Sequence, residues 1–235
     1  MGMRKPVAIV AAMRREVAPL LRGISAQTQD GLELYELPSA LVVIGGIGRE
    51  AGFKAAEIAA REAQPELLMS AGLAGALARD LKAGDVLQAR EVIDEATGEH
   101  YVTTGGEAVV VTALRVSGTQ RKSALASRYS ATAVDMEASS VAAVARQHDI
   151  AFMAVKAISD EFDCPMPPVD RFVGQDGRMQ ELAFGAYIAV RPQWWLPTLR
   201  LAINSSSASK NLCRALEHLI QEHAQATSSE RKVRL

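Results

Sequence analysis

Residues 131–160 read ATAVDMEASSVAAVARQHDIAFMAVKAISD, a stretch in which two short apolar runs each end in a carboxylate. The first run leads to Glu137, residues 138–148 have the apolar spacing of an Ala-rich helix, and a second run over residues 151–157 leads to Asp160. Strands joined by a helix usually lie parallel, and parallel strands end at one edge of the sheet, where α/β proteins bind ligands. We therefore predict that Glu137 and Asp160 face one crevice.

Two segments of this stretch, residues 133–138 (AVDMEA) and 155–160 (VKAISD), resemble the paired signature of the nucleoside phosphorylase and nucleosidase superfamily, which includes methylthioadenosine/S-adenosylhomocysteine nucleosidase. Residues 70–87, which contain SAGLAGAL and LKAGDVL, add a third similar segment. The resemblance covers residues 7–160 well and 161–223 loosely. It implies an α/β, three-layer phosphorylase/hydrolase-like fold, in which a twisted mixed sheet is flanked by helices.

The resemblance implies three catalytic carboxylates. Glu137 would accept hydrogen bonds from the ribose hydroxyls and stabilise an oxocarbenium-like state, with Met136 packed against the sugar. Asp160, oriented by Ser159, would protonate N7 of the purine if burial raises its pKa. Glu16 follows the first predicted strand and aligns with the glutamate that activates water in nucleosidases. The alternative for Glu16 is a structural role at a helix N-terminus.

Further substrate contacts are expected at small or polar positions of the similar segments: Gly46, Gly48, Gly72, Leu73, Ala74 and Lys156. The glycines at 45–48 lie between a predicted strand and a helix, which leaves backbone N–H groups free to face an anion. Two positions depart from the family. Leu73 replaces a usual serine, and Lys156 replaces a usual arginine, which keeps the charge but loses the bidentate fork.

The nucleophile decides between a hydrolase and a phosphorylase. Attack by water would use Glu16, which favours hydrolysis slightly. Attack by phosphate would need cations to hold the anion, and the candidates are Arg14, Arg15 and Arg49. No cofactor is expected other than phosphate as a co-substrate.

The resemblance is weaker over residues 91–128, where the family supplies an aromatic residue that stacks on the base. Residues 116–121 (VSGTQR) contain no Phe or Tyr. Arg121 could replace the aromatic ring, because a guanidinium can stack on a base, or it could be a solvated charge.

The C-terminal part resembles a narrower branch, the hopanoid-associated phosphorylases, in its Asp176-Gly177 turn and in the segment RPQWWLPTLRL at residues 191–201. This resemblance implies an adenosylated lipid as substrate. Trp194 and Trp195 could contact a membrane interface, but packing against the sheet or a dimer partner is the simpler interpretation.

The chain has 235 residues and is 49% hydrophobic, which suits one domain over residues 1–223, followed by a frayed polar tail at 224–235. Its net charge of −1 gives no reason to expect a nucleic-acid partner. Two distant cysteines and His218 and His223, five apart, predict neither a disulfide nor a metal site. We expect a cytoplasmic location, and the family resemblance implies a homodimer.

The sequence also predicts the remaining elements. Strands are expected at residues 7–12, 32–37, 40–44 and 67–71, with a further one starting near 86, and helices at 13–21, 49–63, 179–190 and 207–223. The function we expect is cleavage of the N-glycosidic bond of an adenine nucleoside. The alternatives are a methylthioadenosine/S-adenosylhomocysteine nucleosidase and a nucleoside-binding relative without activity.

Overall fold

The computed structural model describes residues 5–116, 118–174 and 177–233. Ser117 and Asp176, which belong to two of the segments quoted above, lie outside the described residues, as do residues 234–235 of the predicted tail. Within the described residues the strands are β1 (Val7–Ala11), β2 (Gln27–Gln29), β3 (Leu32–Glu36), β4 (Ala40–Ile44), β5 (Leu67–Ala76), β6 (Val86–Asp94), β7 (His100–Val102), β8 (Ala108–Thr112), β9 (Ala133–Asp135) and β10 (Ala151–Asp160).

The helices of the same described residues are α1 (Arg14–Val17), α2 (Arg49–Ala63), α3 (Thr119–Tyr129), α4 (Ala138–Gln147), α5 (Glu181–Ala189) and α6 (Trp195–Val233). Two short 3₁₀ turns, η1 (Val169–Phe172) and η2 (Pro192–Trp194), precede α5 and α6. None of the helices described is both long and apolar enough to cross a bilayer.

The strands form one mixed sheet that closes on itself at one end. The order β10-β6-β8-β9-β5-β1-β4-β3-β2 leaves β10 beside β6, and β10 also pairs with β5. Strands β5, β10, β6, β8 and β9 therefore make a ring, from which β1, β4, β3 and β2 extend as an open sheet. The long β5 belongs to both parts, because its first half pairs with β1 and its last residues pair with β9.

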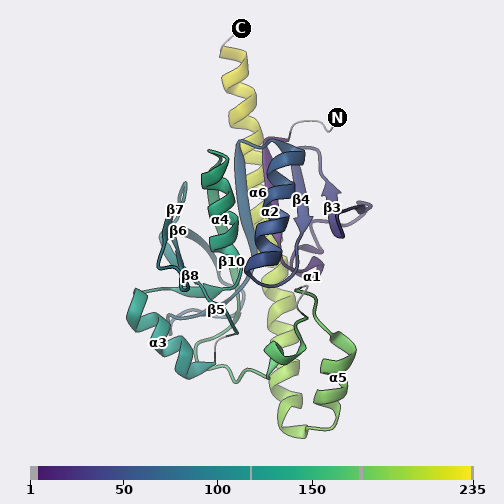
Figure 1. The fold of residues 1–235 in the computed structure, drawn as a ribbon, viewed down its shortest axis with the longest axis vertical. Coiled ribbons are helices and arrows are strands. Elements are labelled where there is room, and N and C mark those ends of the chain that lie inside the picture. Colours follow the sequence, from purple (N-terminus) through teal and green to yellow (C-terminus); the bar gives the residue numbers. More distant parts are fainter. Residues whose placement is uncertain (1–4, 117, 175–176, 234–235) are drawn as a thin grey trace.

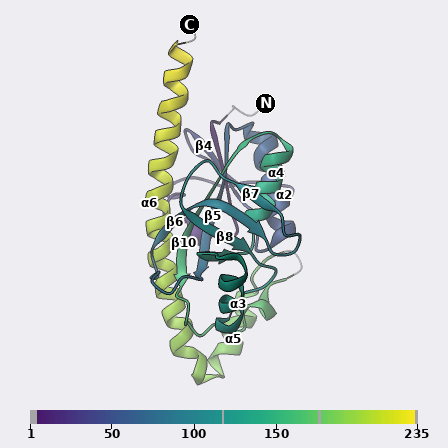
Figure 2. The same ribbon diagram turned by 90° about the vertical axis from the view of Figure 1, so that its left-hand side faces the viewer.

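Helices cover both faces of this sheet, which gives three layers (Figures 1 and 2). Alanine-rich α2 and α4 pack side by side on one face, where their small side chains let helix and sheet approach closely. The middle of α6 covers the other face with Ala208, Leu212 and Leu216, which are fully buried. The predicted fold class is confirmed.

The prediction that the strands leading to Glu137 and Asp160 are parallel to each other was wrong. Strand β10 is parallel to β5, but β9 is antiparallel to β5 and pairs its Val134 with Gly75. The two strands thus approach the end of β5 from opposite directions. Their ends still meet, since Asp160 is also opposite Gly75, and closure of the ring rather than parallel pairing brings them together.

The C-terminal helix is longer than predicted. The sequence indicated a helix over 207–223 followed by a frayed tail, whereas α6 begins at Trp195 and ends at Val233. The first part of α6 forms a hairpin with α5 that projects from one end of the molecule, and its last turns extend past the opposite end (Figures 1 and 2). Predicted helix 13–21 is shorter, as only Arg14–Val17 is helical.

Candidate active site

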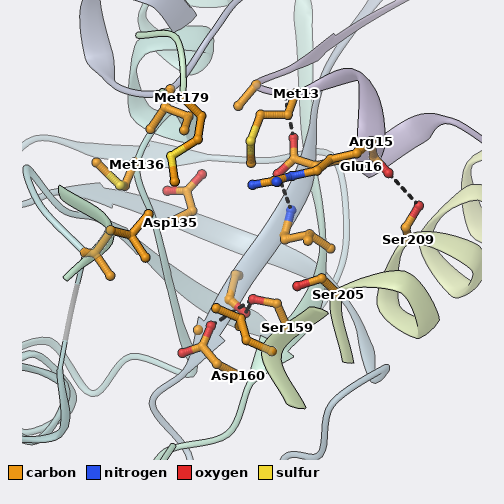
Figure 3. Close-up of a pocket in the computed structure, with 18 of the residues that line it drawn as sticks. Met13, Arg15, Glu16, Asp135, Met136, Ser159, Asp160, Met179, Ser205 and Ser209 are labelled. Atoms are coloured by element: carbon orange, nitrogen blue, oxygen red, sulfur yellow. Dashed lines mark hydrogen bonds between the residues drawn. The ribbon is translucent and has the colours of Figure 1, made fainter. Parts of the chain in front are cut away.

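A cavity of about 710 Å³ lies where β1, β5, β9 and β10 end and where the α5–α6 hairpin joins the body. Glu16, Glu137 and Asp160 all line it, together with Asp135 and Ser159. Figure 3 shows Glu16, Asp135, Ser159 and Asp160 in the cavity, with Met13 and Met136 on its wall. The structure thus brings together the three carboxylates that the sequence singled out from positions up to 144 residues apart (160 minus 16).

Glu16 is buried just after the end of β1, on the one-turn helix α1. Its Oε2 accepts a hydrogen bond from the backbone N–H of Met13 (3.0 Å), and its Oε1 accepts one from the N–H of Leu73 (3.2 Å). Burial raises the pKa of Glu16, although these two N–H groups and the ammonium of Lys156 act in the opposite direction. A fixed carboxylate with a raised pKa suits a general base that works near neutral pH.

Glu137 follows β9 and faces the N-terminus of α2. Its Oε1 accepts a hydrogen bond from the N–H of Gly48 (2.7 Å), the residue before the first turn of that helix. Burial and the neighbouring Asp135 carboxylate raise the pKa of Glu137 to about 8, against the weaker lowering effect of Lys156. The Glu137 carboxyl group therefore keeps its proton at neutral pH. Hydrogen bonds donated to it by hydroxyl groups would favour its ionised form.

The raised pKa makes Glu137→Gln a stabilising change at high pH. The folded carboxyl group, with a pKa of about 8, keeps its proton when the unfolded one, near 4.5, has lost it, so the contribution of Glu137 to stability is complete below pH 4.5 and is lost as the pH rises to 8. At pH 8 we expect the unfolding free energy of the variant to exceed that of the parent by up to about 4 kcal/mol, which is a Tm rise of up to roughly 8–16 °C, and at pH 4.5 we expect the two proteins to be about equally stable.

Thermal denaturation between pH 4.5 and 9 would measure this difference. Glu217→Gln, which changes an exposed carboxylate on α6, is the matched control and should give the same Tm difference at every pH. If the Tm difference between the Glu137→Gln variant and the parent stays constant from pH 5 to 8, Glu137 is not protonated in the folded protein.

Asp160 ends β10 as a buried carboxylate with both oxygens bonded. Ser159 Oγ donates to Oδ1 (2.8 Å), and the ammonium of Lys122 donates to Oδ2 (2.5 Å). Lys122 comes from α3, is 1% exposed, and also donates to the carbonyls of Asp160 (3.3 Å) and Glu161 (2.7 Å), which uses its three N–H bonds. The sequence argument assumed a carboxyl group without a cationic partner. The structure instead shows a buried ion pair at this position.

Lys122 is the residue of this site that the sequence analysis missed. The sequence contains a weak indication of this role. Lys122 and Leu125, the buried residues of α3, are three positions apart and so lie on one face of the helix. A lysine on the apolar face of a short helix indicates a buried anion, since an unpaired charge there is costly. The region of weaker resemblance therefore supplies a cation to Asp160.

Lys156 lies beneath the site and does not line the cavity. Its ammonium pairs with Asp135 Oδ2 (2.8 Å) and donates to Ser70 Oγ (2.9 Å), while Asp135 Oδ1 accepts from Thr112 (2.7 Å). The expected substrate contact of Lys156 is thus replaced by a fully bonded buried pair. Its charge still acts on the site through the pKa values of Glu16 and Glu137.

The other predicted contacts divide into two groups. Leu73, Ala74, Met136 and Ser159 line the cavity, whereas Gly46, Gly48 and Gly72 do not. The N–H of Gly48, expected to face a phosphate or ribose, is bonded to Glu137 instead. Gly72 packs on Glu16, as a Cβ there would be 3.4 Å from Oε2. The loss of a serine hydroxyl at Leu73 is offset by its backbone N–H, which holds Glu16.

The three cationic candidates for phosphate differ in position. Arg49 does not line the cavity and pairs with Asp94. Arg14 also lies outside it, with its guanidinium over the ring of Tyr35 (5.8 Å to the centroid). Arg15 lines the cavity, but its side chain is 56% exposed and lies 3.8 Å from the Glu181 carboxylate. The predicted cluster of three cations around a phosphate does not form.

Arg121, the proposed replacement for a stacking aromatic residue, does not line the cavity either. Its Nη2 donates to Glu95 (2.6 Å). Beyond the carboxylates, the cavity extends between the 161–180 loop and the α5–α6 hairpin. The apolar side chains there are Met166, Val169, Val173, Met179, Phe184 and Leu201, and the same helices add polar ones, Glu181, Thr198, Ser205, Ser206 and Ser209. The site therefore has a carboxylate end and a mainly apolar end with hydroxyl groups in its wall.

Comparisons with known proteins agree with this geometry. The sequence model of the Phosphorylase superfamily matches residues 95–185. The fold is similar to that of futalosine hydrolase from Helicobacter pylori, with a TM-score of 0.71 at 18% identity, covering 93% of this chain and 98% of that one. It is also similar to Arabidopsis thaliana 5′-methylthioadenosine nucleosidase, with a TM-score of 0.69 at 17% identity, covering 93% and 96% of the two chains. At these identities the structural similarity shows the fold.

A third similar structure is 5′-methylthioadenosine/S-adenosylhomocysteine nucleosidase from Helicobacter pylori, solved in complex with a pyrrolopyrimidine pyrrolidine compound. Its TM-score is 0.67 at 19% identity, and the match covers 93% of this chain and the whole of that one. Because the match covers 93% of this chain, it includes part of the α5–α6 region.

Proposed function

We propose that this chain is an enzyme that hydrolyses the N-glycosidic bond of an adenine nucleoside carrying a large apolar 5′ substituent. The match of residues 95–185 to the Phosphorylase superfamily and the similarity of the fold to known nucleosidases support this proposal. One observation supports this most directly. Glu16, Glu137 and Asp160 line a single cavity whose far end is apolar.

The three carboxylates match the needs of the reaction. The bond from C1′ of the ribose to N9 of the base breaks with its electron pair moving to the base, so positive charge develops on the sugar and negative charge on the purine. Glu137 lies at a position to bind the ribose hydroxyls, which favours its ionised form and stabilises the cationic sugar. Glu16 takes a proton from the water that attacks C1′.

The Lys122–Asp160 pair serves the leaving base. The proton that reaches N7 passes through Asp160, which touches the base, and is supplied by the Lys122 ammonium behind it, which becomes a neutral amine until solvent reprotonates it. An Asp160 oxygen also accepts a hydrogen bond from the exocyclic amino group of adenine. A 6-oxopurine presents an oxygen there, which would face the carboxylate as a second acceptor. This arrangement favours adenine over hypoxanthine.

Water is the better supported nucleophile. Glu16 is buried and held by two backbone N–H groups, as a positioned general base requires. Phosphate would need several cations close to C1′. Of the three arginine candidates, Arg49 is paired with Asp94 and Arg14 lies outside the cavity. Arg15 lines the cavity, as do Arg22, Arg115 and Lys210. The choice of water therefore rests on Glu16.

The apolar end of the cavity supports a 5′ substituent larger than methylthio. A volume of 710 Å³ lies in the upper half of the range of small-molecule sites, about 300–1,000 Å³. Met, Val, Phe and Leu side chains form much of the wall beyond the carboxylates, together with Ser and Thr hydroxyls and Glu181. An adenosylated hopanoid precursor, which the C-terminal resemblance implies, has this character. Methylthioadenosine and S-adenosylhomocysteine are the smaller alternatives.

Release of the free base, measured by chromatography, tests the proposal. Adenosine, methylthioadenosine, S-adenosylhomocysteine and a 5′-alkyl adenosine, which would release adenine, and inosine, which would release hypoxanthine, would each be incubated with and without phosphate. We expect release without phosphate, fastest from the alkyl compound, and Glu16→Gln should lower the rate by about 10²–10⁴. Glu181→Gln, which changes an exposed carboxylate at the same cavity, is the control and should lower the rate less than about threefold.

The outcomes separate the alternatives. Release only with phosphate would make the protein a phosphorylase and contradict the role of Glu16. Release from methylthioadenosine but not from the alkyl compound would favour the smaller substrates. Binding of every compound without release would identify a nucleoside-binding relative.

A further inference from the structure

The hairpin formed by α5, η2 and the first turns of α6 carries an unpartnered apolar surface. Its members are large side chains that are each more than half exposed: Leu182, Val190, Trp195, Leu196, Leu199 and Ile203. On α6, residues 195, 199 and 203 are four apart and form a stripe along one side of the helix. Leu182 lies in the first turn of α5, and Val190 directly follows its last residue, Ala189. We call these six residues the hairpin patch.

Most of the contacts that hold the hairpin use residues outside the patch, and Trp195 is a patch residue that also takes part. Phe172 contacts the rings of Phe184 (5.4 Å) and Tyr187 (5.3 Å), and Arg191 stacks over Tyr187 at 3.8 Å from the ring centroid. The indole N–H of Trp195 donates to the carbonyl of Ile188 (3.0 Å) and ties α6 to α5. Figure 1 shows the hairpin projecting from the body, which leaves the patch accessible.

The charges around the patch are mostly positive, and Glu181 at the start of α5 is the acidic residue of the hairpin. The sequence contains no Asp or Glu between Glu181 and Glu217, whereas Arg191 and Arg200 lie within and beside the patch. Arg200 is exposed and follows Leu196 by four residues, so the two side chains are neighbours on the helix surface. An apolar surface with a tryptophan and flanking arginines is complementary to an anionic bilayer surface.

A second copy of the chain fits this surface less well. A two-fold contact through the patch would bring Arg191 and Arg200 of both copies together, without an acidic residue of the hairpin beyond Glu181 to neutralise them. We therefore propose that the hairpin patch docks on an anionic lipid surface. The same helices contribute Phe184, Thr198 and Leu201 to the cavity wall, so docking brings the apolar end of the cavity next to the lipid.

Tryptophan fluorescence can report contact between the hairpin and a lipid surface. Its two tryptophans, Trp194 and Trp195, both lie in the hairpin. With vesicles of phosphatidylcholine and phosphatidylglycerol, we expect the fluorescence of the full chain to shift to the blue and to be quenched by brominated lipid. Vesicles of phosphatidylcholine alone should bind at least about tenfold more weakly, and 0.5 M salt should reduce the difference.

Leu196→Asp/Leu199→Asp should weaken vesicle co-sedimentation at least about tenfold, because both changes place a carboxylate on the docking surface. Val102→Asp is the matched control, since Val102 is 81% exposed on β7, and its binding should equal that of the parent. Adenine release from water-soluble adenosine by the double variant, measured without lipid, should be unchanged, which separates docking from the reaction.

Two results would overturn the proposal. One is the absence of a blue shift and of co-sedimentation with anionic vesicles. The other is a dimer, seen by analytical ultracentrifugation, that the Leu196→Asp/Leu199→Asp variant converts to a monomer, because the patch would then be covered by a second copy.

Discussion

Asp160→Asn should lower kcat for adenine release by about 10³-fold, because an amide in place of the carboxylate removes the route by which a proton reaches N7 of the base. The amide would keep the shape of the side chain and one acceptor, so the Kd of an uncleavable adenine nucleoside analogue should change less than about tenfold. The measurement is single-turnover release of adenine together with analogue binding by calorimetry.

The control for this change is Asp163→Asn, three residues further along the chain, where the carboxylate is exposed and pairs with Arg79. Its kcat should match that of the parent. A full-rate Asp160→Asn protein would exclude Asp160 as the source of the proton, and an Asp160→Asn loss that appears equally in analogue binding would give Asp160 a role in affinity alone.

Lys122→Met should lower kcat by about 10²-fold with little effect on KM, because Asp160 loses the ammonium that positions it and supplies its proton. Lys122→Arg should recover part of the rate, as it retains a cation at Oδ2. Arg128→Met, which removes an exposed cation from the same helix, is the control and should leave kcat unchanged.

The stability of the same variants gives a second, independent readout. Either single change leaves one buried charge without its partner and should cost about 3–5 kcal/mol of unfolding free energy. The double change Lys122→Met/Asp160→Asn removes both charges, so it should be more stable than Asp160→Asn alone and no slower. If the double variant loses as much unfolding free energy and as much activity as the two single variants combined, the two residues act separately.

Much of the fold could be predicted from local sequence pattern. Apolar runs bounded by turn residues located β1, β3, β4 and β10, and Ala-rich spacing located α2 and α4 within one or two residues. These features depend on burial and on contacts between residues close in the chain. The ends of α1 and α6 were not predicted, because helix length there depends on packing against distant elements rather than on local propensity.

The candidate site could be predicted in part, because a strand end followed by an acidic residue is visible in the sequence. That pattern picked out Glu16, Glu137 and Asp160, which share one cavity. The pattern could not tell which polar groups would face the cavity. Lys156, Arg49 and Gly48 are of the right type for ligand binding, but each is already bonded to a carboxylate of the protein.

Local residue type and spacing in the sequence determined many of the elements, among them β1, β3, β4, α2 and α4, and the resemblance to a known family implied the layer arrangement and the three carboxylates. Tertiary structure alone decided two things. Closure of the sheet joined the end of antiparallel β9 to that of β10, and the fold of residues 118–129 placed Lys122 against Asp160. The contacts involved lie far apart in the chain: 59 positions for Val134 and Gly75, 85 for Gly75 and Asp160, and 38 for Lys122 and Asp160. Such contacts depend on the packing of the whole chain, which local periodicity does not encode.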